Sequence, residues 1–333
     1  MSFNYHIANS NPPPSPTPSD SSFDDDEANC RVTPYWQKFR GLLKTRGFRL
    51  DTVRDVKEYY KRHSERGSLD SVCPEQFPGF RRACQHSDDD DLCPDAGLLD
   101  NLFRGTRSRD GLKVVVKAVN LYSREYEVIR LLSSPPLRDD PMNHTIPILD
   151  LIDVPRDRIA FIVMEEWSSQ LIPDSGPCCL SLFLAALRQC IEHAVFLHRN
   201  HIAHLDISLR NLLTDYNGRY AYIDYELSRR FSSGSEPLIY SYRGTEVPPE
   251  CERMDAVDAY KIDVWALAIL ILRACQTAGY HIPELMQLVG PMLYEDPRRR
   301  PPLSLVLQTF DRLMQTFKQN RVDTPPSAIE HRH

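Results

Sequence analysis

The hydrophobic pattern changes its period part-way along this chain. From about Leu98, short apolar runs alternate with turn residues, and "LFRGTR", "SRDG" and "LKVVVKAV" together indicate a β-hairpin. After Pro177 the period becomes helical, and "LSLFLAALRQCIEHAVFLH" places one apolar face along a helix, formed by Leu180, Leu184, Leu187, Ile191, Ala194 and His198. The sequence therefore predicts a small β-rich part followed by a larger helical part.

Composition narrows the class of protein. Of the 333 residues, 41% are hydrophobic, which is enough for a substantial core. The net charge of −6 does not favour a nucleic-acid partner. The longest apolar run, "VWALAILIL", is too short to span a membrane and is expected to be a buried helix. The nine cysteines include no C-x-x-C pair, so reduced packing thiols in a cytoplasmic or nuclear, not secreted, protein are expected.

The two ends of the chain differ from its middle. Residues 1–30 are rich in Pro, Ser and Asp, carry no signal-peptide pattern, and are expected to be a disordered tail, as are residues 319–333. Residues 31–97 are expected to form a helical basic extension and linker. Its first helix is predicted to begin at Pro34, with Thr33 as the N-cap. A docked helix with solvated charges is favoured over a nucleic-acid role for it.

A second hairpin is predicted around Asn217-Gly218, the strongest short-range hairpin signal. If these two residues form the loop, counting along the ladder places Asn211 directly opposite Asp224. A carboxylate and an amide oxygen at the base of a hairpin suit Mg²⁺. Asp206 lies five residues before Asn211, within reach of the same place. A hairpin with ordinary polar ends is the alternative.

A buried ion pair is predicted upstream of that hairpin. Lys117 interrupts the strand "VVVKAV", and Glu125 shares a helix face with Val128, Ile129 and Leu132. A carboxylate on an apolar face is costly unless it is paired, and Lys117 is the nearest partner in the pattern. Such a pair can present a lysine to phosphate oxygens, whereas the alternative is a Glu125 that reaches solvent at the helix edge.

These residues resemble the protein kinase superfamily, and in particular the kinase-like proteins of basidiomycete fungi. "VVVKAV" is similar to the V-A-I-K strand, "HLDISLRN" to the H-R-D-x-x-x-x-N catalytic loop, and "IDYE" stands where D-F-G is expected. "VPPE", "DVWALA" and "DPRRRPP" resemble the A-P-E motif, the D-V-W-S-L-G helix and the arginine segment of the family. The likeness spans about residues 98–314 and implies a two-lobed α+β protein-kinase-like fold, with lobes at 98–167 and 168–318.

The resemblance implies ATP and Mg²⁺ as cofactors and a protein as substrate. Lys117 would hold the α- and β-phosphates, oriented by Glu125, and Asp206 would orient the attacking hydroxyl or accept its proton. Asn211 and Asp224 would bind Mg²⁺. The other implied nucleotide contacts are Gly105 of the glycine-rich loop, the gatekeeper Met164, and the hinge residues Glu165, Glu166 and Trp167; the implied structural residues are His204, Glu250, Asp263 and Arg300.

The sequence departs from the family pattern in four places. Only Gly105 remains of the glycine-rich loop, and Leu205 replaces the arginine of H-R-D. Ser208 stands where Ser/Thr kinases carry a lysine. Arg210 resembles the catalytic-loop pattern of tyrosine kinases. Glu226 replaces the D-F-G glycine, as an additional candidate Mg²⁺ ligand or as a repulsive charge.

Three hypotheses follow from these motifs. The first is a protein kinase that acts on Ser or Thr hydroxyls. The second is a small-molecule kinase, because "HLDISLRN" followed by "IDYE" also resembles choline kinases and aminoglycoside phosphotransferases. The third is a pseudokinase, a binding module in which the altered loop and Glu226 prevent turnover.

Overall fold

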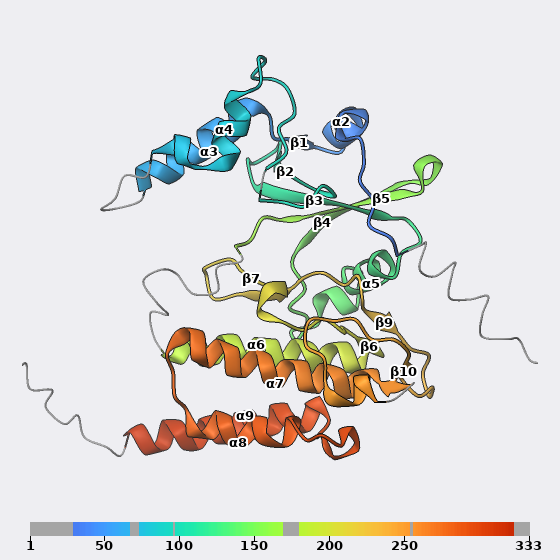
Figure 1. Cartoon of the computed structure of the whole chain (residues 1–333), viewed down its shortest axis with the longest axis vertical. Helices are drawn as coiled ribbons and strands as arrows, with labels where there is room; N and C mark the ends of the chain where they lie inside the picture. Colours follow the sequence, from blue (N-terminus) through green and yellow to red (C-terminus); the bar gives the residue numbers. More distant parts are fainter. Residues whose placement is uncertain (1–28, 67–72, 96, 169–179, 254–255, 323–333) are drawn as a thin grey trace, which may run out of the picture.

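A five-stranded antiparallel sheet forms the core of the smaller lobe (Figure 1). The computed structural model describes residues 29–66, 73–95, 97–168, 180–253 and 256–322. The strands lie in the order β1-β2-β3-β5-β4, with the bounds Phe48–Leu50 (β1), Leu102–Arg107 (β2), Lys113–Asn120 (β3), Ile148–Val154 (β4) and Ile159–Glu165 (β5). β2 and β3 confirm the predicted hairpin, and Leu102 lies opposite Lys117.

The edge strand β1 comes from the segment predicted as a helical extension. It pairs with β2, from Phe48 opposite Arg107 to Leu50 opposite Gly105. The chain then forms a helical insertion before it reaches β2, composed of α3 (Val53–Arg66), η1 (Pro74–Gln76) and α4 (Pro78–Cys84). The small-lobe sheet therefore draws its first strand from residues 31–97, ahead of the predicted boundary at residue 98.

Helix α2 (Trp36–Thr45) covers one face of the sheet. Trp36 packs on Phe103 and Phe39 on Phe161, with ring centroids 5.1 and 5.0 Å apart. The predicted helix start at Pro34 is wrong, because the helix begins at Trp36 and its N-cap, Tyr35, makes no side-chain cap bond. The indole N–H of Trp36 donates to the Asp100 carbonyl at 3.0 Å, so tertiary contacts outweigh the local capping signal.

Helix α5 (Arg124–Leu132) lies between the sheet and the larger lobe (Figure 1). Its N-cap is Ser123, whose hydroxyl accepts a hydrogen bond from the Tyr126 amide. The predicted apolar face is buried, including Glu125, while Glu127 is exposed as expected. This helix therefore carries a carboxylate into the space between the lobes.

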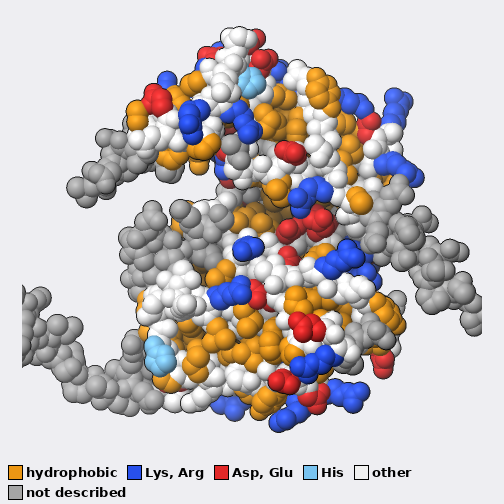
Figure 2. All heavy atoms as spheres, in the orientation of Figure 1, with side chains coloured by type: hydrophobic (Ala, Val, Ile, Leu, Met, Phe, Trp, Pro, Cys, Tyr) orange, Lys and Arg blue, Asp and Glu red, His pale blue; other side chains and the backbone are white. Residues whose placement is uncertain are grey.

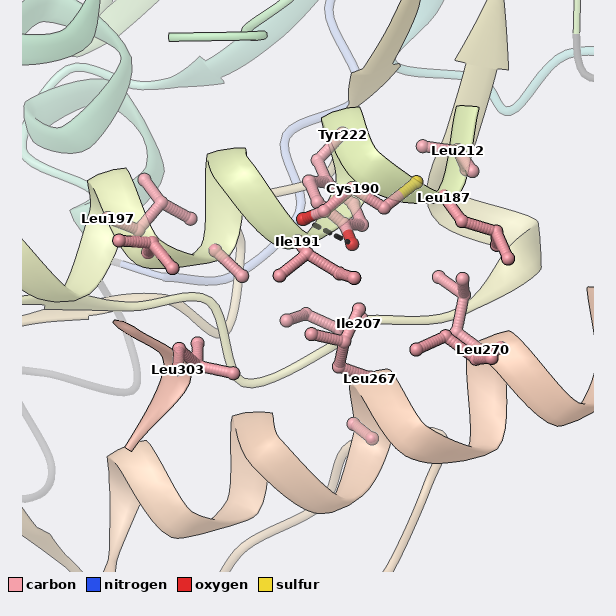
Figure 3. Close-up of a cluster of buried hydrophobic side chains, with 14 of the residues drawn as sticks. Leu187, Cys190, Ile191, Leu197, Ile207, Leu212, Tyr222, Leu267, Leu270 and Leu303 are labelled. Atoms are coloured by element: carbon pink, nitrogen blue, oxygen red, sulfur yellow. Dashed lines mark hydrogen bonds between the residues drawn. The ribbon is translucent and has the colours of Figure 1, made fainter. Parts of the chain in front are cut away.

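The larger lobe is a helical bundle. Its long helices are α6 (Leu180–Arg199), α7 (Ala259–Ala278), α8 (Pro283–Met292) and α9 (Leu303–Val322). Figure 3 shows Leu187 and Ile191 of α6 facing Leu267 and Leu270 of α7, with Ile207 between the two helices. Asp258 caps α7 by accepting from two backbone amides, and Gly279 ends it with a φ of 68°. The predicted apolar run "VWALAILIL" lies within α7 and is mostly buried.

Disordered tails were predicted at both ends of the chain, and the structure describes only small parts of them. Residues 1–28 and 323–333 of the predicted tails lie outside the described residues. Asn29 and Cys30, predicted as part of the disordered N-terminal tail, are instead described, and Asn29 accepts a hydrogen bond from the Arg124 amide. Residues 319–322, predicted as part of the disordered C-terminal tail, instead continue helix α9.

Among the described helices, α6 is long and apolar enough to cross a membrane. Over half of its apolar stretch is buried in the core, as in any central core helix.

Short elements complete the larger lobe. They form two-stranded pairs: β6 (Ile202–Ala203) with β9 (Arg229–Arg230), β7 (Leu212–Thr214) with β8 (Tyr220–Tyr222), and β10 (Leu238–Ile239) with β11 (Val257–Asp258). The 3₁₀ turns of this lobe are η4 (Leu209–Asn211), η5 (Pro249–Glu252) and η6 (Pro297–Arg299), whereas η2 (Leu137–Asp139) and η3 (Pro155–Asp157) lie in the smaller lobe, before β4 and between β4 and β5. These elements connect the core helices to the site described below.

Several cysteines serve as packing residues. The cysteines that the structure describes are free thiols, and three of them are buried: Cys93, Cys190 and Cys275. Burial raises the pKa of the Cys190 thiol to about 12, so it stays protonated at neutral pH. Figure 3 shows Cys190 among leucine and isoleucine side chains of the core.

Candidate active site

The molecule is hollowed between its two lobes, and acidic and basic side chains gather there (Figure 2). Lys117 lies between two carboxylates: its Nζ donates to Glu125 Oε1 at 2.6 Å and to Asp224 Oδ1 at 3.0 Å. Burial opposes the charge on Lys117, but attraction to both carboxylates outweighs it and raises the pKa of the ammonium. The predicted contact between Lys117 and Glu125 is present, with Asp224 as a second partner.

Asp224 is held in an ionised form beside this lysine. Burial raises the pKa of its carboxyl, but Lys117 outweighs that effect and lowers the pKa below the ordinary value of 3.8. Its backbone has a φ of 65°, in the left-handed region that non-glycine residues seldom adopt. An ionised carboxylate fixed in an uncommon backbone conformation is typical of a functional site rather than of a plain hairpin end.

Asp206 and Asn211 lie together on the loop that follows β6. The Asn211 amide Nδ2 donates to Asp206 Oδ2 at 2.7 Å and to the Asp206 carbonyl at 3.0 Å. The other carboxylate oxygen, Oδ1, accepts from the Thr245 backbone amide at 2.7 Å. Both oxygens of Asp206 are thus oriented, one by the Asn211 side chain and one by the Thr245 backbone.

Asp263 of α7 supports the loop from beneath. Its carboxylate accepts from the backbone amides of His204 and Leu205, each at 2.8 Å, and contacts His198 Nε2 at 2.9 Å. Leu205 has a φ of 63°, which is strained for a branched side chain. The two charge-assisted hydrogen bonds offset that strain, so Asp263 holds the loop from which Asp206 projects.

The two residues ahead of Asp206 are buried. Leu205, which replaces the family arginine, packs in an apolar cluster with Ile239, Val257 and Ile262. His204 is fully buried against the Tyr225 ring, and burial lowers the pKa of its imidazole, which is therefore neutral. In place of an arginine that could meet a phosphate, this loop has an apolar anchor.

The predicted register of the second hairpin is wrong by one residue. Leu212 lies opposite Tyr222, and Asn211 lies opposite Ile223, whose amide donates to the Asn211 carbonyl at 3.0 Å. The loop is wider than a two-residue turn because the Asp215 carboxylate accepts from the amides of Asn217 and Arg219. An aspartate that satisfies these amides stabilises the wider loop.

Asn211 and Asp224 have separate partners in the structure. The Asn211 amide group donates to Asp206, and Asp224 accepts from Lys117 with its backbone in the left-handed region. Without direct opposition across the hairpin, the association of these groups with one site stays a prediction. Their roles as Mg²⁺ ligands remain predictions.

Gly105 does not belong to a phosphate-binding loop, and that prediction is wrong. It lies inside β2, opposite Val114 on one side and Leu50 on the other. A Cβ atom at this position would lie 2.7 Å from the Arg49 carbonyl oxygen, so the glycine allows β1 to approach β2. The sequence signal was a glycine in a strand pattern, which indicates a close backbone approach as readily as a ligand.

The packing role of Gly105 can be tested directly by substitution. Gly105→Ala is expected to destabilise the protein by about 1–3 kcal/mol, because the added methyl group meets backbone that cannot move away easily. Denaturant unfolding measures the change. Gly41→Ala is the matched control: it lies in α2 with no atom within 4 Å of the added methyl, and should raise stability slightly. An equal response of both variants would contradict the packing role of Gly105.

The residues predicted as the hinge lie at the end of β5 and directly after it, and their side chains contact protein partners. Met164 packs against the main core, and Trp167 Nε1 donates to Glu165 Oε2 at 2.9 Å. Glu166 accepts from Arg104 Nε at 2.5 Å, and Arg104 also pairs with Asp95 of the insertion. Glu166 therefore ties the hinge to β2 and the helical insertion.

Sequence reasoning missed three residues at this site. Arg104 lies opposite Val115 on the sheet face that also carries Lys117, a position that strand alternation alone could have indicated. Thr245 reaches Asp206 through its backbone, and Arg31 contacts Glu226 at 3.4 Å. The last two contacts join segments far apart in the sequence, and no local pattern predicts them.

The remaining predicted structural pair is formed. The buried guanidinium of Arg300 donates to both Glu250 oxygens, at 2.5 and 2.6 Å. Arg300 Nε also donates to the Tyr294 carbonyl, and its guanidinium lies over the Trp265 ring. This pair ties η5 to the segment before α9.

Comparisons with known proteins agree with this geometry. A sequence model of the protein kinase domain matches residues 161–284. Serine/threonine-protein kinase chk1 of Schizosaccharomyces pombe is 26% identical over 149 residues, covering 36% of this chain and 30% of that protein. The serine/threonine-protein kinase SIK3 homolog of Danio rerio is 23% identical over 270 residues, covering 67% of this chain and 22% of that protein.

A third relative, putative sperm motility kinase W of Mus musculus, is 30% identical over 113 residues, covering 33% of this chain and 22% of that protein. The chain thus spans less than a third of the length of these curated relatives. The matches support the protein kinase superfamily. With the sheet lobe and the helical lobe described above, the fold is the two-lobed α+β fold of a protein kinase domain.

Proposed function

We propose that this protein is an ATP- and Mg²⁺-dependent phosphotransferase that moves the γ-phosphoryl group to a protein hydroxyl, with Ser or Thr favoured. The observation that carries the proposal is the shared contact of Lys117 with Glu125 and Asp224, beside the joined pair of Asp206 and Asn211. Catalysis of this kind is mostly positioning and charge neutralisation, and needs these groups in fixed places.

The residues present fit a magnesium–nucleotide complex. Mg²⁺ prefers a few protein oxygens together with phosphate oxygens, and the Asn211 amide oxygen and the ionised Asp224 carboxylate supply such atoms. Among the described residues, no group of three or more His, Cys, Asp or Glu side chains could hold a metal ion. The bound metal would neutralise charge that develops on the phosphoryl group.

Lys117 and Asp206 would have separate roles in the transfer. Lys117, kept charged by its two carboxylates, would hold phosphate oxygens. Asp206, with both oxygens oriented by Asn211 and Thr245, would align the acceptor hydroxyl and take its proton. We favour Ser or Thr as acceptor because the similar proteins are named serine/threonine kinases. We also propose that the chain belongs with the kinase-like proteins of basidiomycete fungi, which its sequence motifs resemble.

One set of observations favours a pseudokinase as the second candidate. In the part of the β1–β2 connection that the structure describes, a helical insertion stands in place of a glycine-rich loop, and Gly105 lies within a strand. Arg104 and Glu166 also form an ion pair between β2 and the hinge. The small-molecule kinase hypothesis has less support, because the buried pair of Glu250 and Arg300 matches the activation-segment anchor of protein kinases.

Nucleotide binding is the first test. ATP with Mg²⁺ at about 100 times its dissociation constant should stabilise the folded protein by about 2.7 kcal/mol, seen as a rise of several degrees in melting temperature. Chelating the metal should remove most of the shift. Asp224→Asn, which keeps the side-chain shape but not the charge, should do the same. No shift at saturating nucleotide would favour a module that does not bind ATP.

Phosphoryl transfer decides between the remaining hypotheses. Labelled ATP is offered with a generic protein substrate and, separately, with small alcohols. The proposal expects label in the protein fraction. Label only in the small alcohols would support a small-molecule kinase, and no label in either, with nucleotide bound, would support the pseudokinase.

A further inference from the structure

We propose that residues 29–32 form a strap that positions the nucleotide site, with Asn29 fixing helix α5 and Arg31 acting as a counter-ion to Glu226. The strap lies ahead of α2, and Figure 1 shows the chain passing α5 on its way to the small lobe. The inference deepens the proposed function and rests on it for its nucleotide-binding part.

The first contact of the strap is at the start of α5. Asn29 Oδ1 accepts from the Arg124 backbone amide at 2.9 Å, and Ser123 Oγ accepts from the Tyr126 amide at 3.2 Å. The first amides of a helix have no partner within the helix, and each side-chain acceptor stabilises the first turn. Asn29 therefore supplies, from far along the chain, a second cap to the turn that carries Glu125.

This turn matters because Glu125 holds Lys117. The carboxylate is nearly fully buried and accepts from Lys117 Nζ at 2.6 Å, and a buried carboxylate of this kind is costly without its partner. If the first turn of α5 loosens, the contact between Glu125 and Lys117 loosens with it. A cap on the Arg124 amide, one residue before Glu125, acts directly on that geometry.

The second contact of the strap is an ion pair with the residue that departs most from the family pattern. Arg31 Nη2 lies 3.4 Å from Glu226 Oε2, with side chains 45% and 33% exposed. A pair this exposed adds little to overall stability. Its effect is local, because Glu226 lies near Asp224 and Glu125, where an anionic nucleotide would bind.

Arg31 balances part of the negative charge at this end of the site. Glu125, Asp224 and Glu226 place three carboxylates around this end of the site, against Lys117 and Arg31. Removing Arg31 would take away one of the two cations that pair with these carboxylates, and the added negative potential would repel phosphate. Arg31 offsets the charge that Glu226 introduces in place of a glycine.

The strap also borders the site physically. A small pocket is lined by residues 29–32 on one side and by Lys117, Glu125 and Glu226 on another. The buried amide of Asn101 lines the same pocket. The strap is therefore part of the wall of the site and not a distant surface segment.

The counter-ion role is tested by a charge cycle in the full chain. Arg31→Ala is expected to weaken Mg·ATP binding about fivefold, as for the loss of one nearby positive charge. Adding Glu226→Gln to that variant should restore affinity to within about twofold of the starting protein, because the unbalanced charge is gone. Lys38→Ala is the matched control: it removes an exposed basic partner, of Asp157, away from the site, and should leave affinity unchanged.

The positioning role is tested without nucleotide. Asn29→Ala should speed hydrogen exchange of the Arg124 amide by about three- to tenfold, as for the loss of a helix cap. Exchange within α7 should not change. Unchanged exchange at Arg124 would overturn the cap, and an Arg31→Ala variant with unaltered affinity, or one not rescued by Glu226→Gln, would overturn the counter-ion.

These two arms separate the strap from the proposed function. If the unaltered protein binds no nucleotide, the phosphotransferase proposal and the counter-ion role both fail. The exchange measurement still decides whether Asn29 caps α5. Faster exchange in that case supports the strap as a positioning element of α5 alone.

Discussion

Asp206→Asn is expected to lower phosphoryl transfer about 10²- to 10⁴-fold, the range that a positioned acid–base group contributes. The substitution keeps the size of the side chain, and one oxygen can still accept from the Thr245 amide. What it removes is the carboxylate that would align the acceptor hydroxyl and take its proton. The measurement is the initial rate of label transfer from ATP to protein.

Two controls make this result specific. Asp206→Asn loses the hydrogen bond from Asn211 Nδ2, so its stability should fall by no more than about 0.5–1.5 kcal/mol. The Mg·ATP stabilisation should persist, since Lys117 and Asp224 are unchanged. Asp215→Asn, on the nearby hairpin loop, should transfer at the normal rate because its carboxylate bonds to Asn217 and Arg219 of its own loop. Equal transfer by Asp206→Asn and the starting protein would contradict the assignment of Asp206.

Arg300→Ala is expected to destabilise the protein by about 3–5 kcal/mol, the cost of leaving a buried charge without its partner. The Arg300 and Glu250 side chains are 0% and 3% exposed, so water cannot replace the lost hydrogen bonds. The substitution also removes the bond to the Tyr294 carbonyl and the contact with the Trp265 ring. Denaturant unfolding of the full chain measures the change.

A double variant tests whether an unpaired buried charge causes the loss of stability expected for Arg300→Ala. Arg300→Met combined with Glu250→Met should be less destabilising than the sum of the single changes, because no buried charge is left unpaired. Arg298→Ala, an exposed arginine in the same turn, should change stability by at most about 0.5 kcal/mol. Additive effects of the two buried substitutions would show that the ion pair is not the source of the loss.

Prediction from sequence succeeded where a local period decides the structure. Strand alternation placed the β2–β3 hairpin, and helical spacing placed Glu125 on the buried face of α5, because a charged group among apolar neighbours requires a partner. Prediction was less successful at turns and caps. The hairpin after Asn211 has a different register because the Asp215 side chain competes with the Asn-Gly signal.

The glycine-rich loop shows a second kind of error. Gly105 is consistent with both a phosphate loop and a close strand contact, and only the pairing with β1 distinguishes them. β1 itself is three residues long and lies in a segment of helical pattern, so its place in the sheet depends on long-range pairing that no local signal indicates.

From its residues alone, this chain is predicted to have a β-rich lobe ahead of a helical lobe, with Lys117, Glu125, Asp206, Asn211 and Asp224 as its reactive groups. These features depend on period and on the cost of burying charge, which act over a few residues. Only the tertiary structure brings Asp224 to Lys117, Thr245 to Asp206 and Arg31 to Glu226. Such contacts join segments that meet only when the lobes are folded, so chain packing and not local preference determines them.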